Sequence, residues 1–131
     1  MASSTNALQA AIFSRLTGDA TLTGMIGANA VFDRRLTGKA MPYLVLSEIA
    51  TSDFGPDAEE HLVTIEAWSD AEGRRQAQEI AARAKVLLDG AALSLTGFAL
   101  VNLLHRSTRA RREPKTKAHV AQMVFRAVTE A

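Results

Sequence analysis

Three histidines are the side chains best suited to acid–base chemistry or metal binding near neutral pH. They are His61, His105 and His119, and their spacing forms no HxxH, HxH or HExxH pattern. The chain has no cysteine, which excludes disulfides, thiolate metal sites and a cysteine nucleophile. We therefore expect no metal centre, and we interpret the histidines as surface or strand-end residues.

Serines, glycines and single aromatics carry no stronger signal for catalysis. No serine lies in the G-x-S-x-G pattern of a nucleophile elbow, so a Ser–His–Asp triad has no local support. Gly18, Gly24 and Gly27 do not match the GxGxxG phosphate-binding pattern, and helix stops and turns explain them better. Tyr43 and Trp68 stand alone, which favours a packing role. The sequence thus predicts neither an enzyme nor a bound cofactor.

Charge is concentrated in two segments. Residues 106–117 contain six basic side chains and one acid, whereas residues 48–60 contain five acids and no lysine or arginine. The residues of these two segments are our candidates for a subunit interface or a surface that faces DNA. They are Arg106, Arg109, Arg111, Arg112, Lys115, Lys117, Asp53, Asp57, Glu59 and Glu60.

Three interpretations of these charged segments stay open. The first is a pair of solvated surfaces without specific partners, because exposed charges often contribute little. The second is nucleic-acid binding by residues 106–117. That segment lacks interleaved aromatic residues, so it would contact phosphates without reading the sequence. The third is a contact between subunits, in which the basic segment of one copy meets the acidic segment of the next.

These side chains belong to a chain of 131 residues, about the length of one domain. The chain is 47% hydrophobic and 22% charged, which excludes disorder and fibrous repeats. A formal net charge of +1 argues against nucleic-acid binding over the whole surface. No apolar run approaches the roughly 18 residues of a membrane span, and no secretion signal is visible. Composition predicts a soluble, intracellular protein with one domain over residues 1–131.

Hydrophobic periodicity predicts three helices. The first begins at a cap among residues 3–5 and ends at Gly18 in a left-handed conformation. The second is short and is capped by Asp19. The third spans about residues 71–88 and begins with a Ser69–Glu72 capping box. Its apolar stripe, which we expect to be buried on a sheet, consists of Ala77, Ile80, Ala81, Ala84, Leu87 and Leu88.

Extended segments account for most of the remaining chain. Strands are predicted at residues 43–46, 61–68, 98–106 and 118–128, and residues 31–32 form at most a short strand. Residues 51–60 and 107–117 are expected to be loops, and the second loop is expected to be mobile. The order of elements predicts an α+β fold, with a mainly antiparallel sheet of about four strands and helices packed on one face.

The ordered set of short segments resembles a known family. The segments are residues 18–22, 31–33, 41–46, 61–69, 87–90 and 123–130, and the dipeptides Pro42-Tyr43, Trp68-Ser69 and Phe125-Arg126 are the most diagnostic. In this order they resemble the tail terminator (tail completion) proteins of long-tailed phages and phage-derived gene transfer agents. The resemblance covers nearly the whole chain.

The resemblance implies a structural virion component without catalytic residues or cofactor, assembled in the bacterial cytoplasm. Members of this family form a hexameric ring that caps the head-proximal end of the tail tube and stops tube polymerisation. The implied partners are further copies of the chain, the major tail tube protein and the head-side connector (stopper) protein. DNA passes through the ring without sequence-specific binding. The alternative is a nucleic-acid-binding accessory protein that uses residues 106–117.

Overall fold

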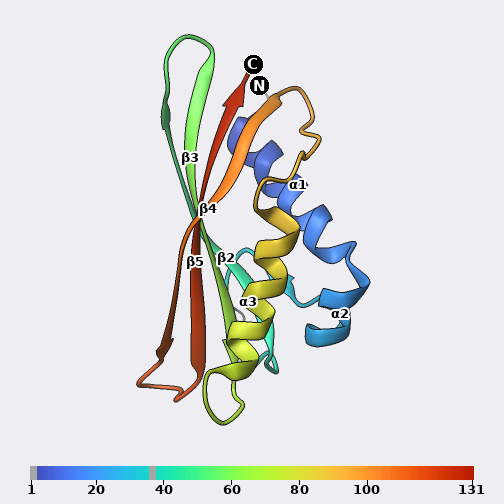
Figure 1. Ribbon diagram of the computed structural model, residues 1–131, viewed down its shortest axis with the longest axis vertical. Helices are drawn as coiled ribbons and strands as arrows, with labels where there is room; N and C mark the ends of the chain where they lie inside the picture. The colour runs from blue at the N-terminus through green and yellow to red at the C-terminus, as the bar shows by residue number, and fades with distance from the viewer. Residues whose placement is uncertain (1–2, 36–37) are drawn as a thin grey trace.

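A computed structural model describes residues 3–35 and 38–131, which contain three helices and five strands (Figure 1). Residues 1–2, and residues 36–37 of the loop expected before Pro42, lie outside the described residues. The helices are α1 (Ser4–Thr17), α2 (Ala20–Ile26) and α3 (Arg75–Leu88). The strands are β1 (Val31–Phe32), β2 (Tyr43–Asp53), β3 (Ala58–Ser69), β4 (Ala99–Arg112) and β5 (His119–Glu130).

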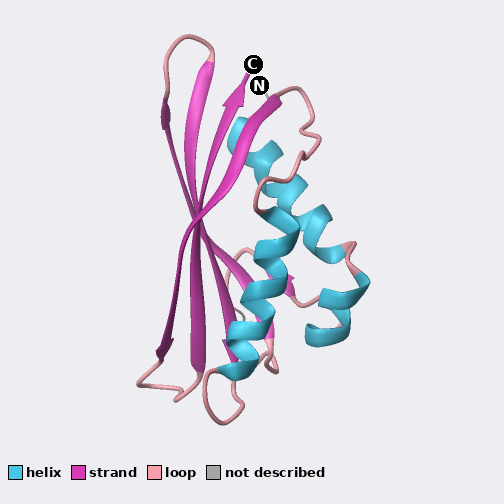
Figure 2. Ribbon diagram, in the orientation of Figure 1, coloured by secondary structure: helices cyan, strands magenta, loops and turns pink. Residues whose placement is uncertain are grey.

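The strands form one sheet in the order β1-β2-β3-β5-β4. The pair β1–β2 is parallel and the other pairs are antiparallel. All the described helices lie on the same face of this sheet (Figure 2), so the predicted α+β fold is confirmed. The sheet has five strands where about four were predicted, because residues 31–32, expected to form at most a short strand, also pair as β1. With two residues, β1 is too short to produce a recognisable alternation of polar and apolar side chains.

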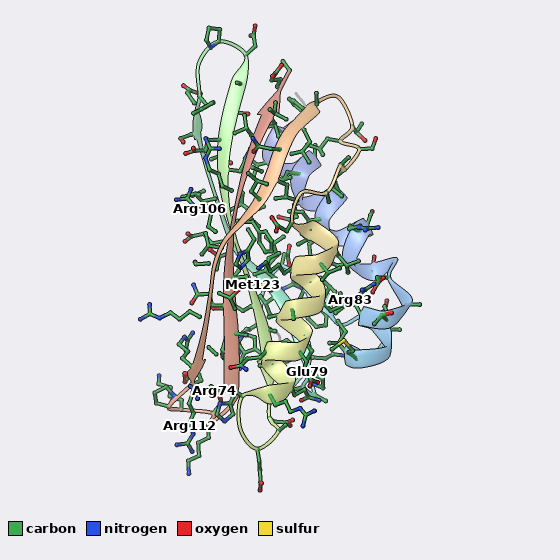
Figure 3. The ribbon with its side chains drawn as sticks, viewed as in Figure 1. Arg74, Glu79, Arg83, Arg106, Arg112 and Met123 are labelled. Carbon is green, nitrogen blue, oxygen red and sulfur yellow. The ribbon has the colours of Figure 1, made fainter. Side chains whose placement is uncertain are left out.

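The apolar stripe of α3 is confirmed. All six of its predicted residues are buried, and they face alternate residues of the two central strands, among them Ile65 and the fully buried Met123. Met123 lies between the sheet and α3 (Figure 3). Small alanines on the stripe let the helix approach the sheet closely, while Ile80 fills the remaining space.

The predicted start of α3 is wrong. The helix begins at Arg75, whose preceding residue makes no side-chain cap hydrogen bond. Ser69 instead belongs to β3 and pairs with His119, so it cannot serve as the helix cap. Its hydroxyl donates to Gln76 Oε1 at 2.5 Å and accepts the N–H of Ala71 at 3.1 Å. Ser69 therefore connects the strand to the helix across the turn between them.

Helix α1 begins as predicted, because the Ser3 hydroxyl accepts the N–H of Asn6 at 3.2 Å. The left-handed stop at Gly18 is wrong, since Gly18 has a right-handed conformation with φ −82°. A tight right-handed turn brings the next residue, Asp19, to the start of α2. There Asp19 Oδ2 accepts the N–H of Leu22 at 2.8 Å, as a helix cap.

Asp19 also connects α2 to α3. The Arg83 guanidinium donates to both of its carboxylate oxygens, at 2.9 and 2.7 Å. These hydrogen bonds, with the one from the Leu22 backbone, lower the pKa of Asp19 from 3.8 to about 2. Along α3 itself, the exposed Arg75 and Glu79 form an ion pair at 2.9 Å. The contact with Asp19 is bidentate and therefore better defined.

The prediction of loops at residues 51–60 and 107–117 is wrong for most of both segments, which belong to strands. Strands β2 and β3 continue to Asp53 and from Ala58, so their turn covers residues 54–57. Strand β4 continues to Arg112 and pairs with β5 from Ser107 to Arg112, which contradicts a loop over residues 107–112. Charged side chains are tolerated there because every side chain of residues 107–112 except that of Ala110 is exposed, while the backbone stays hydrogen-bonded. No helix of the described residues is both long and apolar enough to cross a bilayer.

Replacing Ile80 by Asp is expected to destabilise the protein strongly, because Ile80 is 0% exposed and the carboxylate would have no partner. We expect a loss of about 3–5 kcal/mol in the free energy of unfolding. Urea unfolding followed by circular dichroism measures it. The matched control is Val86→Asp on the same helix, where the side chain is 67% exposed, and its effect should stay within about 0.5 kcal/mol. Equal stabilities of the two variants would contradict the assigned helix face.

Candidate functional site

The two charged segments lie at opposite ends of the long sheet. The turn between β2 and β3 projects at one end, where both chain termini also lie (Figure 1). Arg112 lies at the other end, beside the turn that joins β4 to β5 (Figure 3). Arg106 occupies an irregularity in the pairing of β4, between His105 and Ser107, and lies midway along the strand (Figure 3). The segments therefore do not meet within one chain.

The acidic end contains a pocket of about 520 Å³ beside the β2–β3 turn. Asp53, Asp57, Glu59 and Glu130 contribute acidic side chains to its wall, and Phe98 contributes an apolar one. The C-terminal residue closes this end of the sheet, because the N–H of Ala131 donates to the backbone oxygen of Asp57 at 2.9 Å. The result is a concave surface of one charge sign.

Two of the four predicted acids already have partners within the chain. The Ser4 hydroxyl donates to Glu59, and the Arg126 guanidinium donates to Glu60 Oε2 at 2.6 Å. For Asp53 and Asp57, the described residues place no basic group within 4 Å. These two aspartates are therefore the acids best placed to meet another molecule.

The basic side chains at the other end have few ion-pair partners within the chain. Arg111 lies 3.8 Å from Glu66, at the limit of an ion pair, and the other predicted basic residues have no carboxylate within 4 Å among the described residues. The structure adds two residues that the sequence did not single out. Arg74 immediately precedes α3, at the same end of the molecule as Arg112 (Figure 3), and the Arg35 guanidinium covers the Trp68 ring at 3.9 Å. These two arginines lie in two different connecting segments, each far from residues 106–117 in the sequence. No single run of charged residues could therefore have indicated them.

The interpretation of His61 as a surface residue is wrong. Its ring is completely buried, with Nδ1 2.8 Å from the hydroxyl of Thr51 and Nε2 2.9 Å from that of Thr129. Burial lowers the pKa of His61, and the nearby Glu59 opposes this effect. The ring thus holds β2, β3 and β5 together next to the acidic end.

The other two histidines lie on β4 and β5. His105 Nε2 is 2.6 Å from the Thr108 hydroxyl, and its ring packs edge-on against Phe125 with the ring centres 5.5 Å apart. His119 Nδ1 is buried without a hydrogen-bond partner among the described residues. Within residues 3–35 and 38–131, no three His, Asp or Glu side chains are grouped to hold a metal ion.

Comparison with known families gives the chain its context. The model of the family described as tail completion protein gp17 matches residues 10–130. The chain belongs to this family. The predicted resemblance is therefore confirmed, and membership makes the chain a structural component of a phage-type tail.

Solved structures agree with membership of the tail completion family. A chain in the structure titled "Virion of native gene transfer agent (GTA) particle" is 32% identical, with a TM-score of 0.88 over 100% of both chains. A second solved chain is 13% identical, with a TM-score of 0.67 over 99% of this chain and 98% of that chain. At this identity the second match shows a shared fold only. No curated protein matches the chain.

The stability of the protein should fall as the pH drops below 6.5, the ordinary pKa of a histidine. Since burial lowers the pKa of His61 in the folded state, the unfolded chain binds this proton more readily. The free energy of unfolding should therefore decrease towards acid, by up to about 1.4 kcal/mol per pH unit.

Urea unfolding at pH 5, 6 and 7 tests this dependence in the parent and in the variant His61→Gln, which cannot take up the proton. The variant should show a shallower slope. Part of the dependence on pH should remain in the variant, because burial also lowers the pKa of His105. Identical slopes would contradict the assignment to His61.

Proposed function

We propose that the chain forms a ring, most simply a hexamer, at the head-proximal end of a tail tube. The ring ends tube polymerisation and joins the tube to the head-side connector protein, and DNA passes through its centre. The observation that carries the proposal is the full-length match, at a TM-score of 0.88, to a chain of a gene transfer agent virion. Membership of the tail completion family supports the same role. The proposal places assembly in the bacterial cytoplasm and assigns no catalytic residue.

The shape of the molecule suits a ring. A closed ring is built from head-to-tail contacts, in which one surface of a copy meets a different surface of the next. The described helices cover one face of the sheet and leave the other face open (Figure 2). The chain thus presents two unlike sides, which head-to-tail contacts require.

The basic residues of β4 have two candidate roles in this ring. They line the passage for DNA, or they contact the acidic segment of a neighbour. The distance between the two segments along the sheet supports the first role, because the second would bring opposite ends of two copies together. A net charge of +1 also suits a passage that does not hold phosphates tightly.

The mass of the purified protein across a range of concentrations tests the ring. We expect a species of six times the 14.1 kDa subunit mass, alone or after mixing with tail tube protein, and ring-shaped particles in electron micrographs. Persistent monomers in both conditions would contradict the proposal. Binding to DNA with a steep salt dependence would then favour the nucleic-acid-binding alternative.

Reversing Arg111 and Arg112 to Glu separates the two roles of the basic segment. If these residues face DNA, the ring mass should stay unchanged and assembled particles should retain less DNA. Lys85→Glu, on an exposed position of α3, is the control and should change neither.

A weakened ring would instead indicate a contact with the neighbour, and adding Asp53→Lys and Asp57→Lys should then restore it. These aspartates are the suitable partners because Glu59 and Glu60 are bound within the chain. The change should be modest and sensitive to salt, because an exposed ion pair contributes at most about 1 kcal/mol.

A further inference from the structure

Exposed apolar side chains gather on one part of the sheet. Among the described residues, five large hydrophobic side chains are exposed, and four of them lie on or beside the half of the sheet nearest the β2–β3 turn. We call these four residues the apolar patch: Phe54 (49% exposed), Leu62 (40%), Val101 (50%) and Leu104 (46%). A monomer rarely keeps such side chains together in water without a partner for them.

The apolar patch faces away from the helices. Leu62 and Leu104 alternate with Val63 and Leu103, which are both 0% exposed beneath the helices. The two leucines lie on either side of Arg126, which is opposite both of them in the strand register. The Phe54 ring lies 5.2 Å from the Arg126 guanidinium and so reaches the same face from the turn.

A groove lies on the other side of the molecule, in the helical layer. It has a volume of about 510 Å³ and runs between α1 and residues 92–96. Ala7, Ala10, Ala11 and Leu93 contribute apolar walls. We call it the α1 groove. Its width depends on small side chains, so it offers room for one large apolar side chain.

The groove carries a basic residue at its rim. Arg15 lines it, and its Nε donates to the backbone oxygen of Leu87 at 3.1 Å. Among the described residues, no carboxylate lies within 4 Å of this guanidinium. Phe54, by contrast, stands between the exposed aspartates Asp53 and Asp57. The two surfaces are therefore complementary in charge.

The apolar patch and the α1 groove lie in the same half of the molecule along its long axis. The β2–β3 turn projects at the end where the chain termini lie, and α1 and the segment that leads into β4 run from near this end towards the middle (Figure 1). The patch and groove are on opposite faces of the sheet. A rotation about an axis close to the strand direction can therefore bring the patch of one copy towards the groove of the next.

We propose that Phe54 of one copy inserts into the α1 groove of the next copy, with the rest of the apolar patch packed around it. This inference rests on the proposed ring and identifies the contact that closes it. An aromatic anchor in a pocket, surrounded by charge pairs at the rim, is the arrangement that carries most of the affinity in many protein interfaces. Asp53 and Asp57 then approach Arg15 and fix the orientation.

Disulfide cross-linking tests the contact directly, because the chain has no cysteine of its own. A double variant with Phe54→Cys and Ala10→Cys places one thiol on the turn and one in the groove. Mild oxidation of the assembled ring should give a ladder of linked subunits on a denaturing gel. The matched control combines Phe54→Cys with Glu79→Cys, a position on α3 near the opposite end (Figure 3), and should give no ladder.

A second variant, Phe54→Ser, measures the contribution of the anchor. We expect the concentration for half-maximal ring assembly to rise at least about tenfold, with an unchanged melting temperature because Phe54 is half exposed. Val86→Ser is the control, since Val86 is 67% exposed but lies outside the apolar patch. It should leave assembly unchanged.

The outcomes separate this contact from the ring itself. Rings that form without the Phe54–Ala10 cross-link would overturn the contact and leave the proposed function intact. Rings that form normally with Phe54→Ser but no longer bind tube protein would also overturn it, because the apolar patch would then belong to the tube interface. Monomers in every condition would overturn both the contact and the ring.

Discussion

The antiparallel pairing of β3 with β5 is the interaction on which the rest of the molecule depends. It runs without interruption from Ala58↔Glu130 to Ser69↔His119, in the middle of the sheet. One face of this pair carries Val63, Ile65, Met123 and Phe125, all at most 1% exposed. The apolar stripe of α3 is buried against this face. A shift of one residue in the register would turn these side chains towards solvent, so the pairing and the helix layer stabilise each other.

The length of this pairing also determines what lies at each end. At one end the β2–β3 turn projects beyond the helices, and at the other end the β4–β5 turn lies beside the connection from β3 to α3 (Figure 1). At one end, the buried His61 links Thr51 of β2 to Thr129 of β5 and holds the acidic turn in place. At the other end, β4 and β5 continue together as far as Arg112 and His119. The charged residues therefore stand on hydrogen-bonded strands, which keep their positions defined.

Much of this fold could be predicted from the sequence because its main elements bury regular patterns. The α3 stripe and the alternation in β3 each repeat often enough to be recognised. The ends of the elements could not be predicted in the same way. Charged residues in 51–60 and 107–117 suggested loops, but residues 51–53 pair with 59–61 and residues 107–112 pair with 119–124. Composition does not record such pairing between strands. The capping box at Ser69 was wrong for the same reason, since the register with His119 keeps Ser69 in a strand.

The roles of the charged residues at the candidate site could be predicted only in part, for the same reason. A count of acids in residues 48–60 treats them as equivalent, but Arg126 is close to Glu60 only because β3 and β5 are neighbours. That ion pair gives Glu60 a partner within the chain, and the Ser4 hydroxyl does the same for Glu59. The pairing of β5 with β3 and β4 also places the Arg126 guanidinium between Leu62 and Leu104. There the contact of this guanidinium with the Phe54 ring helps to hold the aromatic side chain on the open face. Internal pairing thus decides which charges remain for assembly, and it positions the apolar residues beside them.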